Sequence, residues 1–340
     1  MAELRVQDRP VQIVQRGTWK FTSEAFVELA GTIIKAVRDF WADHEFPYFL
    51  ITLIPINEGG SKGGTGLTDS FEAFVSSDIE SVGDLKFLLT HELFHTWNGR
   101  KILRQEPEEL VYWFSEGFTD YFTRRILLRA GLITAEEYLT DVNRTIRDYY
   151  LSPAIRATNG DILKFTHTDP QIERMPYLRG DLLAIRWNAA IEKSSSHSLD
   201  DVMRDLLSSA LRSRAVVSAE TVDAHVKKYL RTGVRRDIEE YVDKGQIIIP
   251  GDADLGPCFE LKNETFHKFD LGFQYKKSET GTGWEVTAVD PAGPAFKLGL
   301  RAGDVIISRS IYWNQIDKLS RLKFKKPNGD VKTVEYLPRT

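Results

Sequence analysis

The spacing of hydrophobic residues predicts a small α/β unit at the start of the chain. Over residues 22–44 the apolar positions recur at i, i+3, i+4 and i+7, as on one face of an α-helix. The nearly continuous apolar run at residues 49–56 predicts a buried strand, and residues 71–76 predict another. A short strand is also expected at residues 11–14. The glycine-rich segment between the two main strands is interpreted as a loop.

Helical patterns dominate after residue 80. Apolar residues surround almost the whole circumference of a helix at residues 85–95, which is typical of a helix inside a core. Ser81 and the residues after it resemble a capping box that starts this helix. Further helices are predicted at residues 134–151, 177–193, 199–211 and 218–231, with a polar loop at residues 152–170.

Beyond residue 250 the pattern changes to short strands and turns, which marks a domain boundary. We therefore predict an α+β protein with three parts. An N-terminal α/β lobe covers residues 1–100, a helical lobe covers 101–249, and a small β-rich domain covers 250–340.

The buried helix carries the sequence His91-Glu92-Leu93-Phe94-His95. Residues four apart project from one helix face, so both histidines can bind one cation. Glu92 then lies beside the metal, where it can take a proton from a water activated there. The alternative is a pair of core histidines satisfied by backbone carbonyls.

A catalytic zinc site needs a third protein ligand and an open position. Glu116 follows His95 after twenty residues, enough for a loop and an antiparallel helix, and Gly117 would let helices approach closely. Asp120 lies one turn further on the same face. It can accept the second ring N–H of a ligand histidine, although an exposed helix residue is the simpler interpretation.

These motifs resemble those of the gluzincin metallopeptidases, and His-Glu-Leu-Phe-His-Thr-Trp-Asn is similar to the glycyl aminopeptidase family among them. The resemblance covers roughly residues 20–250. It implies a thermolysin-like catalytic domain with one Zn²⁺ per chain on His91, His95 and Glu116. Glu92 would be the general base, and a peptide or protein would be the substrate. Members of the family usually carry a large β domain ahead of this lobe, for which the chain has little room.

The same resemblance assigns further residues. Tyr177, in a Tyr-x-x-Gly sequence that opens a helix, would stabilise the oxyanion; the alternative is that it only packs at the helix start. The strand bordering the cleft would be near Gly66. Thr68 stands where the family has a glutamate for the substrate amine, so Asp69 or Glu72 would take that role.

Two phrases near the C-terminus resemble the signature of PDZ domains. Residues 269–273 resemble the carboxylate-binding loop, and residues 289–306 resemble the later part of that signature. A strand pair around Asn328-Gly329 completes a small β domain. Only residues 307–321 remain for the second helix that walls the peptide groove. The domain is therefore expected either to capture a peptide tail or only to brace the peptidase.

Composition narrows the function. A net charge of −4 argues against nucleic acid as the main partner, and the single cysteine excludes an intrachain disulfide framework. No window is apolar enough to predict a membrane span, and no signal pattern is found at the start, so a cytoplasmic location is the default. A trimmed start would look the same and would allow export.

The predicted function is a zinc peptidase of aminopeptidase type. Three alternatives stay open at this point. The chain can be an endopeptidase, an inactive peptidase-like scaffold with a working PDZ groove, or a zinc hydrolase acting on non-peptide amides.

Overall fold

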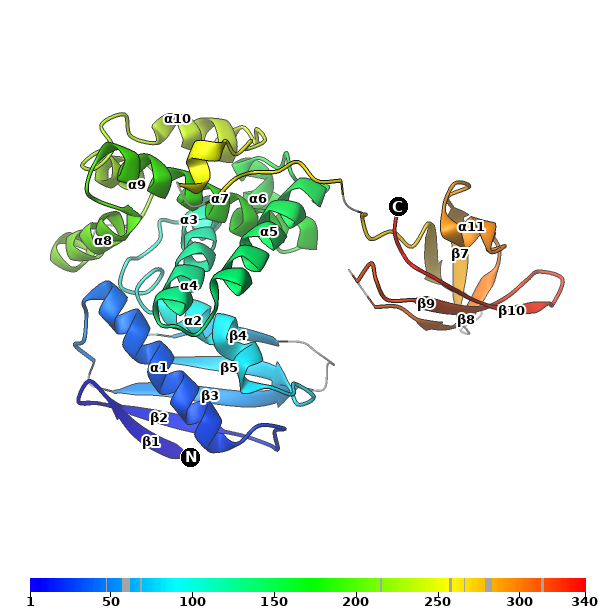
Figure 1. Ribbon diagram of the computed structural model, residues 1–340, viewed down its shortest axis with the longest axis horizontal. Coiled ribbons are helices and arrows are strands. Elements are labelled where there is room, and N and C mark those ends of the chain that lie inside the picture. The colour runs from blue at the N-terminus through cyan, green and yellow to red at the C-terminus, as the bar shows by residue number, and fades with distance from the viewer. Residues whose placement is uncertain are drawn as a thin grey trace. The chain divides into compact units, whose positions relative to one another are not determined.

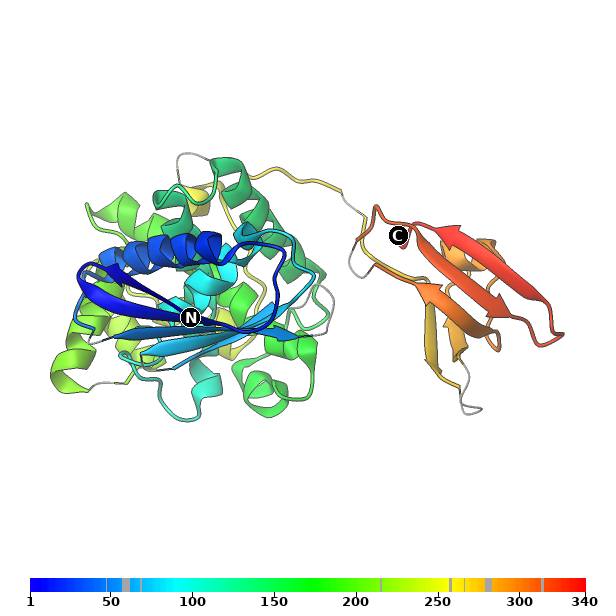
Figure 2. The same ribbon diagram turned by 90° about the horizontal axis from the view of Figure 1, so that it is seen from below.

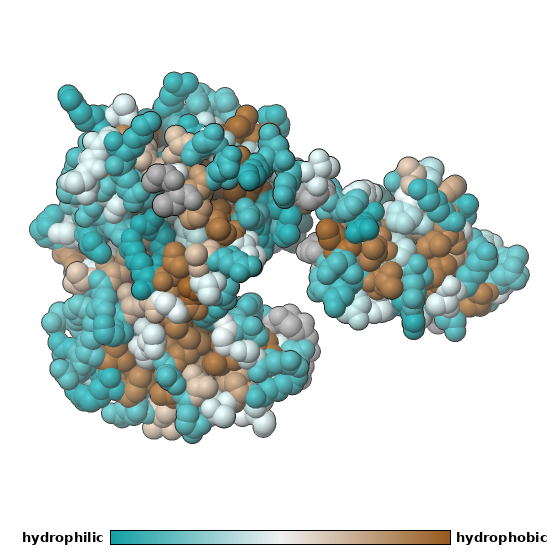
Figure 3. Space-filling model, in the orientation of Figure 1, coloured by the Kyte–Doolittle hydropathy of each residue, from teal (hydrophilic) through white to brown (hydrophobic). Residues whose placement is uncertain are grey.

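The computed structural model describes residues 1–46, 48–56, 62–67, 69–214, 216–256, 259–265, 267–278, 283–312 and 315–340. It divides into two compact units, Met1–Leu261 and Lys262–Thr340. The first unit contains a sheet and a helical region that share one hydrophobic core. Figure 3 shows that hydrophilic residues cover most of the viewed face of this unit.

A five-stranded mixed sheet forms the N-terminal part of the first unit. Its order is β1-β2-β3-β5-β4, in which β2, β3 and β5 run parallel and both outer strands pair antiparallel. Buried residues alternate along β5, as expected for a strand with one face in a core. The strands are β1 (Ala2–Val6), β2 (Arg9–Gln15), β3 (Phe49–Ile56), β4 (Lys62–Gly66) and β5 (Ser70–Ser76).

Two helices, α1 (Ser23–Trp41) and α2 (Lys86–Phe94), lie on one face of this sheet (Figures 1 and 2). Thr22 caps α1 by accepting a hydrogen bond from the backbone N–H of Ala25 at 3.1 Å. Ser81 caps a 3₁₀ turn, Val82–Leu85, that leads into α2. The helix that carries the His-Glu-x-x-His sequence is therefore short, and the second histidine is its C-terminal cap.

The helical region is organised around α7 (Pro170–Ser194), which contacts α3, α4, α5, α6 and α8. The remaining helices are α3 (Tyr112–Ser115), α4 (Gly117–Arg129), α5 (Ala135–Leu151), α6 (Asn159–Phe165), α8 (Leu199–Ser213), α9 (Ala219–Val226) and α10 (Arg235–Asp237), with η2 (Glu108–Val111), η3 (Ile238–Asp243) and η4 (Asp252–Leu255) as short 3₁₀ or π segments. The predicted α+β architecture is confirmed.

Several local predictions differ from the structure. The helix expected at residue 177 begins at Pro170, because Asp169 caps it and proline is tolerated at the first helical position. Pro176 lies inside this helix instead of at its start. The polar loop expected at residues 152–170 contains α6, which Thr158 caps together with Asp161. The part of the glycine-rich segment that the structure describes forms β4.

Two glycines allow α7 to cross the joint between α3 and α4 at close range. A Cβ atom added to Gly117 would lie 2.4 Å from the Cα of Gly180, and one added to Gly180 would lie 1.7 Å from the carbonyl oxygen of Trp113. Gly117 was expected to bring its own helix close to the metal helix. Instead it faces α7, and the segment that carries Glu116 rests directly on that helix.

The second unit is a five-stranded antiparallel sheet in the order β10-β9-β8-β7-β6. The predicted turn at Asn328-Gly329 joins β9 to β10. The described residues between β8 and β9 form no helix. Its elements are β6 (Phe273–Lys277), β7 (Trp284–Val289), α11 (Pro294–Lys297), β8 (Val305–Ser310), β9 (Ser320–Lys325) and β10 (Val331–Tyr336).

Among the described residues, no helix combines the length and the apolar character that crossing a bilayer requires.

Candidate metal centre

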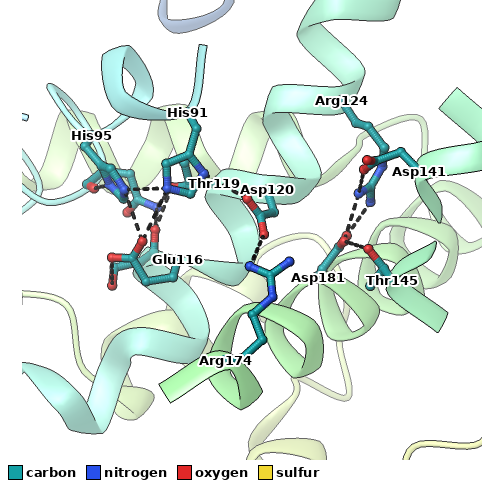
Figure 4. A network of polar contacts seen from close by, with 12 residues as sticks. His91, His95, Glu116, Thr119, Asp120, Arg124, Asp141, Thr145, Arg174 and Asp181 are labelled. Atoms are coloured by element: carbon teal, nitrogen blue, oxygen red, sulfur yellow. Dashed lines mark hydrogen bonds and ion pairs between the residues drawn. The ribbon is translucent and has the colours of Figure 1, made fainter. Parts of the chain in front are cut away.

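Three side chains from two neighbouring segments converge on one point, and Figure 4 shows them. The Nε2 atoms of His91 and His95 lie 3.0 Å apart. The Oε2 atom of Glu116 lies 3.4 Å from the first and 3.1 Å from the second. Ligand atoms arranged tetrahedrally around zinc at about 2.05 Å stand roughly 3.3 Å from one another. The three residues therefore have the spacing that a zinc ion requires.

Hydrogen bonds fix the orientation of both imidazoles. Nδ1 of His91 lies 2.8 Å from Oδ1 of Asp120, and Nδ1 of His95 lies 3.0 Å from the backbone oxygen of Asn98. Both partners are acceptors, so each Nδ1 carries a proton and donates it. Each Nε2 then presents a lone pair toward the shared point, as in metal-bound histidines.

The charges around this point also fit a cation. Burial disfavours a charged imidazole, but Asp120 and Glu116 outweigh it and raise the pKa of His91 to about 10. Burial likewise opposes ionisation of Glu116, yet His95 and His91 hold the pKa of that carboxyl well below its usual range. The carboxylates of Asp120 and Glu116 are therefore stabilised by a positive charge at the imidazoles that lie between them. A proton on His91 supplies it in the absence of metal, and a divalent ion would supply it at Nε2.

Two residues that sequence reasoning missed hold the ligands in place. Asn98 is buried, and its side-chain nitrogen donates to the carbonyl oxygen of Ser115 and the hydroxyl of Thr119, both at 3.2 Å. Its backbone oxygen orients His95, so one residue connects both ligand segments. Arg104 lies with Nη1 3.6 Å from Oε1 of Glu116. Asn98 is the last residue of the family-like His-Thr-Trp-Asn sequence, so the sequence contained an indication that it matters. Nothing in the sequence indicated a role for Arg104.

Glu92 lies between the candidate ligands and strand β4. It is 8% exposed, and burial raises the pKa of its carboxyl, opposed by the neighbouring histidines. A Cβ atom added to Gly64 would lie 2.5 Å from Cγ of Glu92. Only a residue without a side chain therefore fits above this carboxylate.

Tyr177, on α7, faces the candidate ligand His91. Its ring stacks on His91 with centroids 6.2 Å apart. Burial, with smaller contributions from Glu116 and Asp120, raises the pKa of the Tyr177 phenol, so its hydroxyl stays protonated and can donate a hydrogen bond. Arg174, one turn earlier, lies 5.2 Å from the Tyr177 ring centroid and 3.9 Å from the carboxylate of Asp120.

The residues expected to bind substrate do not all lie close to the candidate ligands. Gly66 lies near the candidate ligand His95, because a Cβ atom there would be 3.3 Å from Cβ of that histidine. Thr68 lies outside the described residues. Asp69 is partly exposed just before β5, and its backbone oxygen accepts a hydrogen bond from Leu50.

The structure does not bring Glu72 to this site. Gly64 faces Glu92 and pairs across the sheet with Ala73, whereas Glu72 pairs with Thr65. Successive strand residues point to opposite faces. Glu72 therefore lies on the face of the sheet that is turned away from the metal ligands.

A cavity of about 610 Å³ opens beside His91 and Glu92. It runs from the metal ligands toward the start of β4 and the middle of α5. Its other lining residues are Lys62, Gly63, Gly64, Phe87, Leu88, Asp120, Thr123, Arg124, Asp141, Arg144, Thr145, Pro170, Glu173, Arg174 and Tyr177.

Comparison with known sequences places this site in context. Residues 85–160 match the sequence profile of the family described as M61 glycyl aminopeptidase. This range contains all three candidate ligands as well as Glu92 and Asp120. Leucine aminopeptidase 2 of Aspergillus niger is 28% identical over 115 residues, which cover 34% of this chain and 17% of that enzyme.

Solved structures share the fold. The aminopeptidase N family protein from Idiomarina loihiensis has a TM-score of 0.67 at 18% identity, over 100% of this chain and 66% of that chain. The M1 zinc metallopeptidase from Deinococcus radiodurans has a TM-score of 0.50 at 13% identity, over 73% of this chain and 52% of that one. The chain thus spans only part of the length of each relative.

Proposed function

We propose that the chain is a zinc-dependent aminopeptidase that binds one Zn²⁺ through His91, His95 and Glu116. The observation that carries this proposal is the convergence of two Nε2 atoms and one carboxylate oxygen at mutual distances of 3.0 to 3.4 Å, with Glu92 beside them. The family match over residues 85–160 and the fold of the structural relatives support the same function.

Zinc, when bound, polarises the peptide carbonyl and lowers the pKa of water to about 7. The chain supplies the proton transfers. Glu92 would accept the proton of the attacking water and deliver it to the leaving amine, and its raised pKa makes its carboxylate a stronger base for the first step. Tyr177 donates a hydrogen bond to the oxygen on which negative charge develops. Asp120 and Asn98 hold the two imidazoles in the required tautomer.

Replacing Tyr177 by phenylalanine removes this donor and leaves the ring. We expect kcat to fall by about 10²–10³-fold, because that is the usual cost of losing one oxyanion donor. Zinc content should stay at that of the unchanged protein, since Tyr177 is not a ligand. Steady-state kinetics with metal analysis tests this, and unchanged kcat would assign Tyr177 to packing alone.

The edge of β4 supports exopeptidase action. Leu67 donates its N–H to Ser70 of β5, so the N–H and C=O groups of Gly64 and Gly66 point to the free edge, where an extended substrate can pair. Arg100 already donates to the carbonyl oxygen of Gly66 at 2.7 Å. A substrate paired antiparallel to this edge would have its N-terminal side toward Gly66, where Arg100 occupies the carbonyl group, and this favours substrates with a short N-terminal side.

Asp69 is the candidate partner of the substrate amine. It follows Thr68 directly and is partly exposed just before β5, three residues after Gly66, whose carbonyl oxygen binds Arg100. Glu72 is excluded from this role by its sheet face. The family description suggests N-terminal glycine as the preferred residue.

Peptides with free and with acetylated N-termini test the exopeptidase assignment. The zinc-loaded protein should release the first residue of Gly-first and Ala-first peptides and leave their acetylated forms intact, as followed by mass spectrometry. Cleavage of both sets would show an endopeptidase. Absence of cleavage in both sets, with zinc bound, would overturn the peptidase proposal.

The second unit favours a peptide-binding role in addition to catalysis. Strand β6 is the outer strand of its sheet, and a groove of about 520 Å³ lies along residues 269–275. Gly272 adopts a φ of +73° in this segment, and Asp270 accepts its N–H at 2.7 Å. This groove is where a PDZ-like domain would bind a peptide tail. Titration with peptides that end in a free or an amidated C-terminus tests it.

A further inference from the structure

The cavity beside the metal ligands carries cations at the end away from Glu92. Lys62 begins β4, two residues before Gly64. At about 3.3 Å per strand residue, it lies roughly 7 Å along the cleft from the point above Glu92. Arg144 enters the same cavity from α5. A substrate paired antiparallel to β4 would place the part that follows the scissile bond at this end of the cavity.

Two carboxylates that line this part of the cavity, Asp120 and Asp141, are already engaged. Asp120 is bonded to His91. Asp141 is shared by two guanidinium groups, those of Arg124 and Arg144. The guanidinium of Arg124 is also paired with the buried carboxylate of Asp181, as Figure 4 shows. Glu173 is an exposed residue of the lining.

Lys62 and Arg144 therefore keep binding capacity that these carboxylates do not fill. Nζ of Lys62 donates to the backbone oxygen of Asp84 at 2.7 Å, and no carboxylate of the described residues lies within 4.0 Å of it. Burial lowers the pKa of Lys62, the nearby carboxylate of Asp84 opposes this shift, and the charge of Arg144 adds a smaller lowering contribution. A carboxylate that enters this end of the cavity is attracted by both cations.

We propose that Lys62 and Arg144 form a subsite for a carboxylate of the substrate on the leaving-group side of the scissile bond. This inference rests on the proposed peptidase function and specifies its substrate class. The carboxylate has two possible sources with the same chemistry, an acidic side chain next to the scissile bond or the free C-terminus of a short peptide.

Three peptides separate these sources. Gly-Gln-Ala amide has no carboxylate, Gly-Glu-Ala amide has one on its side chain, and Gly-Gln-Ala with a free C-terminus has one at its end. The zinc-loaded protein should cleave at least one of the two acidic peptides about ten-fold faster in kcat/KM than the neutral peptide, as two partly exposed ion pairs predict. The faster of the two identifies the source.

The variants Lys62→Gln and Arg144→Gln test whether these two residues bind the substrate carboxylate. Combined, they should reduce the preference to less than two-fold. Matched controls are Lys35→Gln, on the exposed face of α1, and Arg147→Gln, on α5 beyond the cavity lining. Both should keep the full preference. Lys62→Glu should in addition favour Gly-Lys-Ala amide over the neutral peptide.

Binding to the zinc-loaded Glu92→Gln protein, measured by calorimetry, gives a readout without catalysis. The acidic peptide that is cleaved faster should also bind this protein with a lower Kd than the neutral peptide. A ratio below two in the unchanged protein, or a ratio that the double variant retains, overturns the carboxylate subsite. A failure of the proposed function is distinct from this, because then none of the three peptides would be cleaved by the unchanged protein.

Discussion

Replacing Glu92 by glutamine should abolish peptide hydrolysis without loss of zinc. The amide keeps the size of the side chain but can neither accept nor return the proton, and general acid–base catalysis is typically worth 10²–10⁴-fold. We expect kcat to fall by about 10³-fold or more, because Glu92 takes part in both proton transfers of the proposed reaction. Stopped assays with a Gly-first peptide and metal analysis of the same samples would measure it.

Glu80→Gln is the matched control for this experiment. Glu80 is an exposed residue on the chain segment leading to α2, paired with Lys20 at 3.3 Å, and its change should leave kcat within two-fold. Glu92→Gln protein that retains zinc and more than a tenth of the activity would contradict the base assignment. Loss of zinc would instead show that Glu92 supports the ligands.

The variant Gly180→Ala should destabilise the first unit and weaken the metal site together. Its new methyl group would lie 1.7 Å from the carbonyl oxygen of Trp113, so α7 and the joint between α3 and α4 must separate. Overpacking of a core costs about 1–3 kcal/mol and occasionally more. The clash here is with backbone atoms, so no side chain can move aside to relieve it. We expect about 3 kcal/mol, which corresponds to a Tm lowered by roughly 6–12 °C.

The helical glycine Gly160 gives the control for this prediction. A methyl group there would meet its nearest neighbour, the hydroxyl of Thr158, at 3.6 Å. Alanine is the better helix former, so Gly160→Ala should be neutral or slightly stabilising. Because Glu116 belongs to the displaced segment, Gly180→Ala should also bind zinc more weakly. An unchanged Tm would show that the helix crossing adapts.

The parts of the fold that could be predicted follow from local patterns. The run at β3 and the apolar stripe of α1 are visible in the sequence, because burial of one face imposes a fixed spacing. The His-Glu-x-x-His spacing likewise places two imidazoles together without knowledge of the fold.

The remainder depends on contacts between distant segments. Nothing near Pro176 indicates that a helix continues through it, since packing against α3 and α4 overrides the local cost. Glu72 and Asp69 are equivalent candidates in the sequence, and only the pairing of β4 with β5 decides which sheet face Glu72 occupies. Gly180 has no local signature at all, because the carbonyl it must avoid belongs to residue 113.

The amide of Asn98 has a consequence for how the protein acquires its metal. Since this one buried group joins the segment of His95 to that of Glu116 through hydrogen bonds alone, the ligand geometry is built by folding and does not wait for the ion. Competing cations in the cell therefore meet a preformed receptor. We expect size and coordination preference to decide which cation is retained, because little rearrangement of these ligands would be needed.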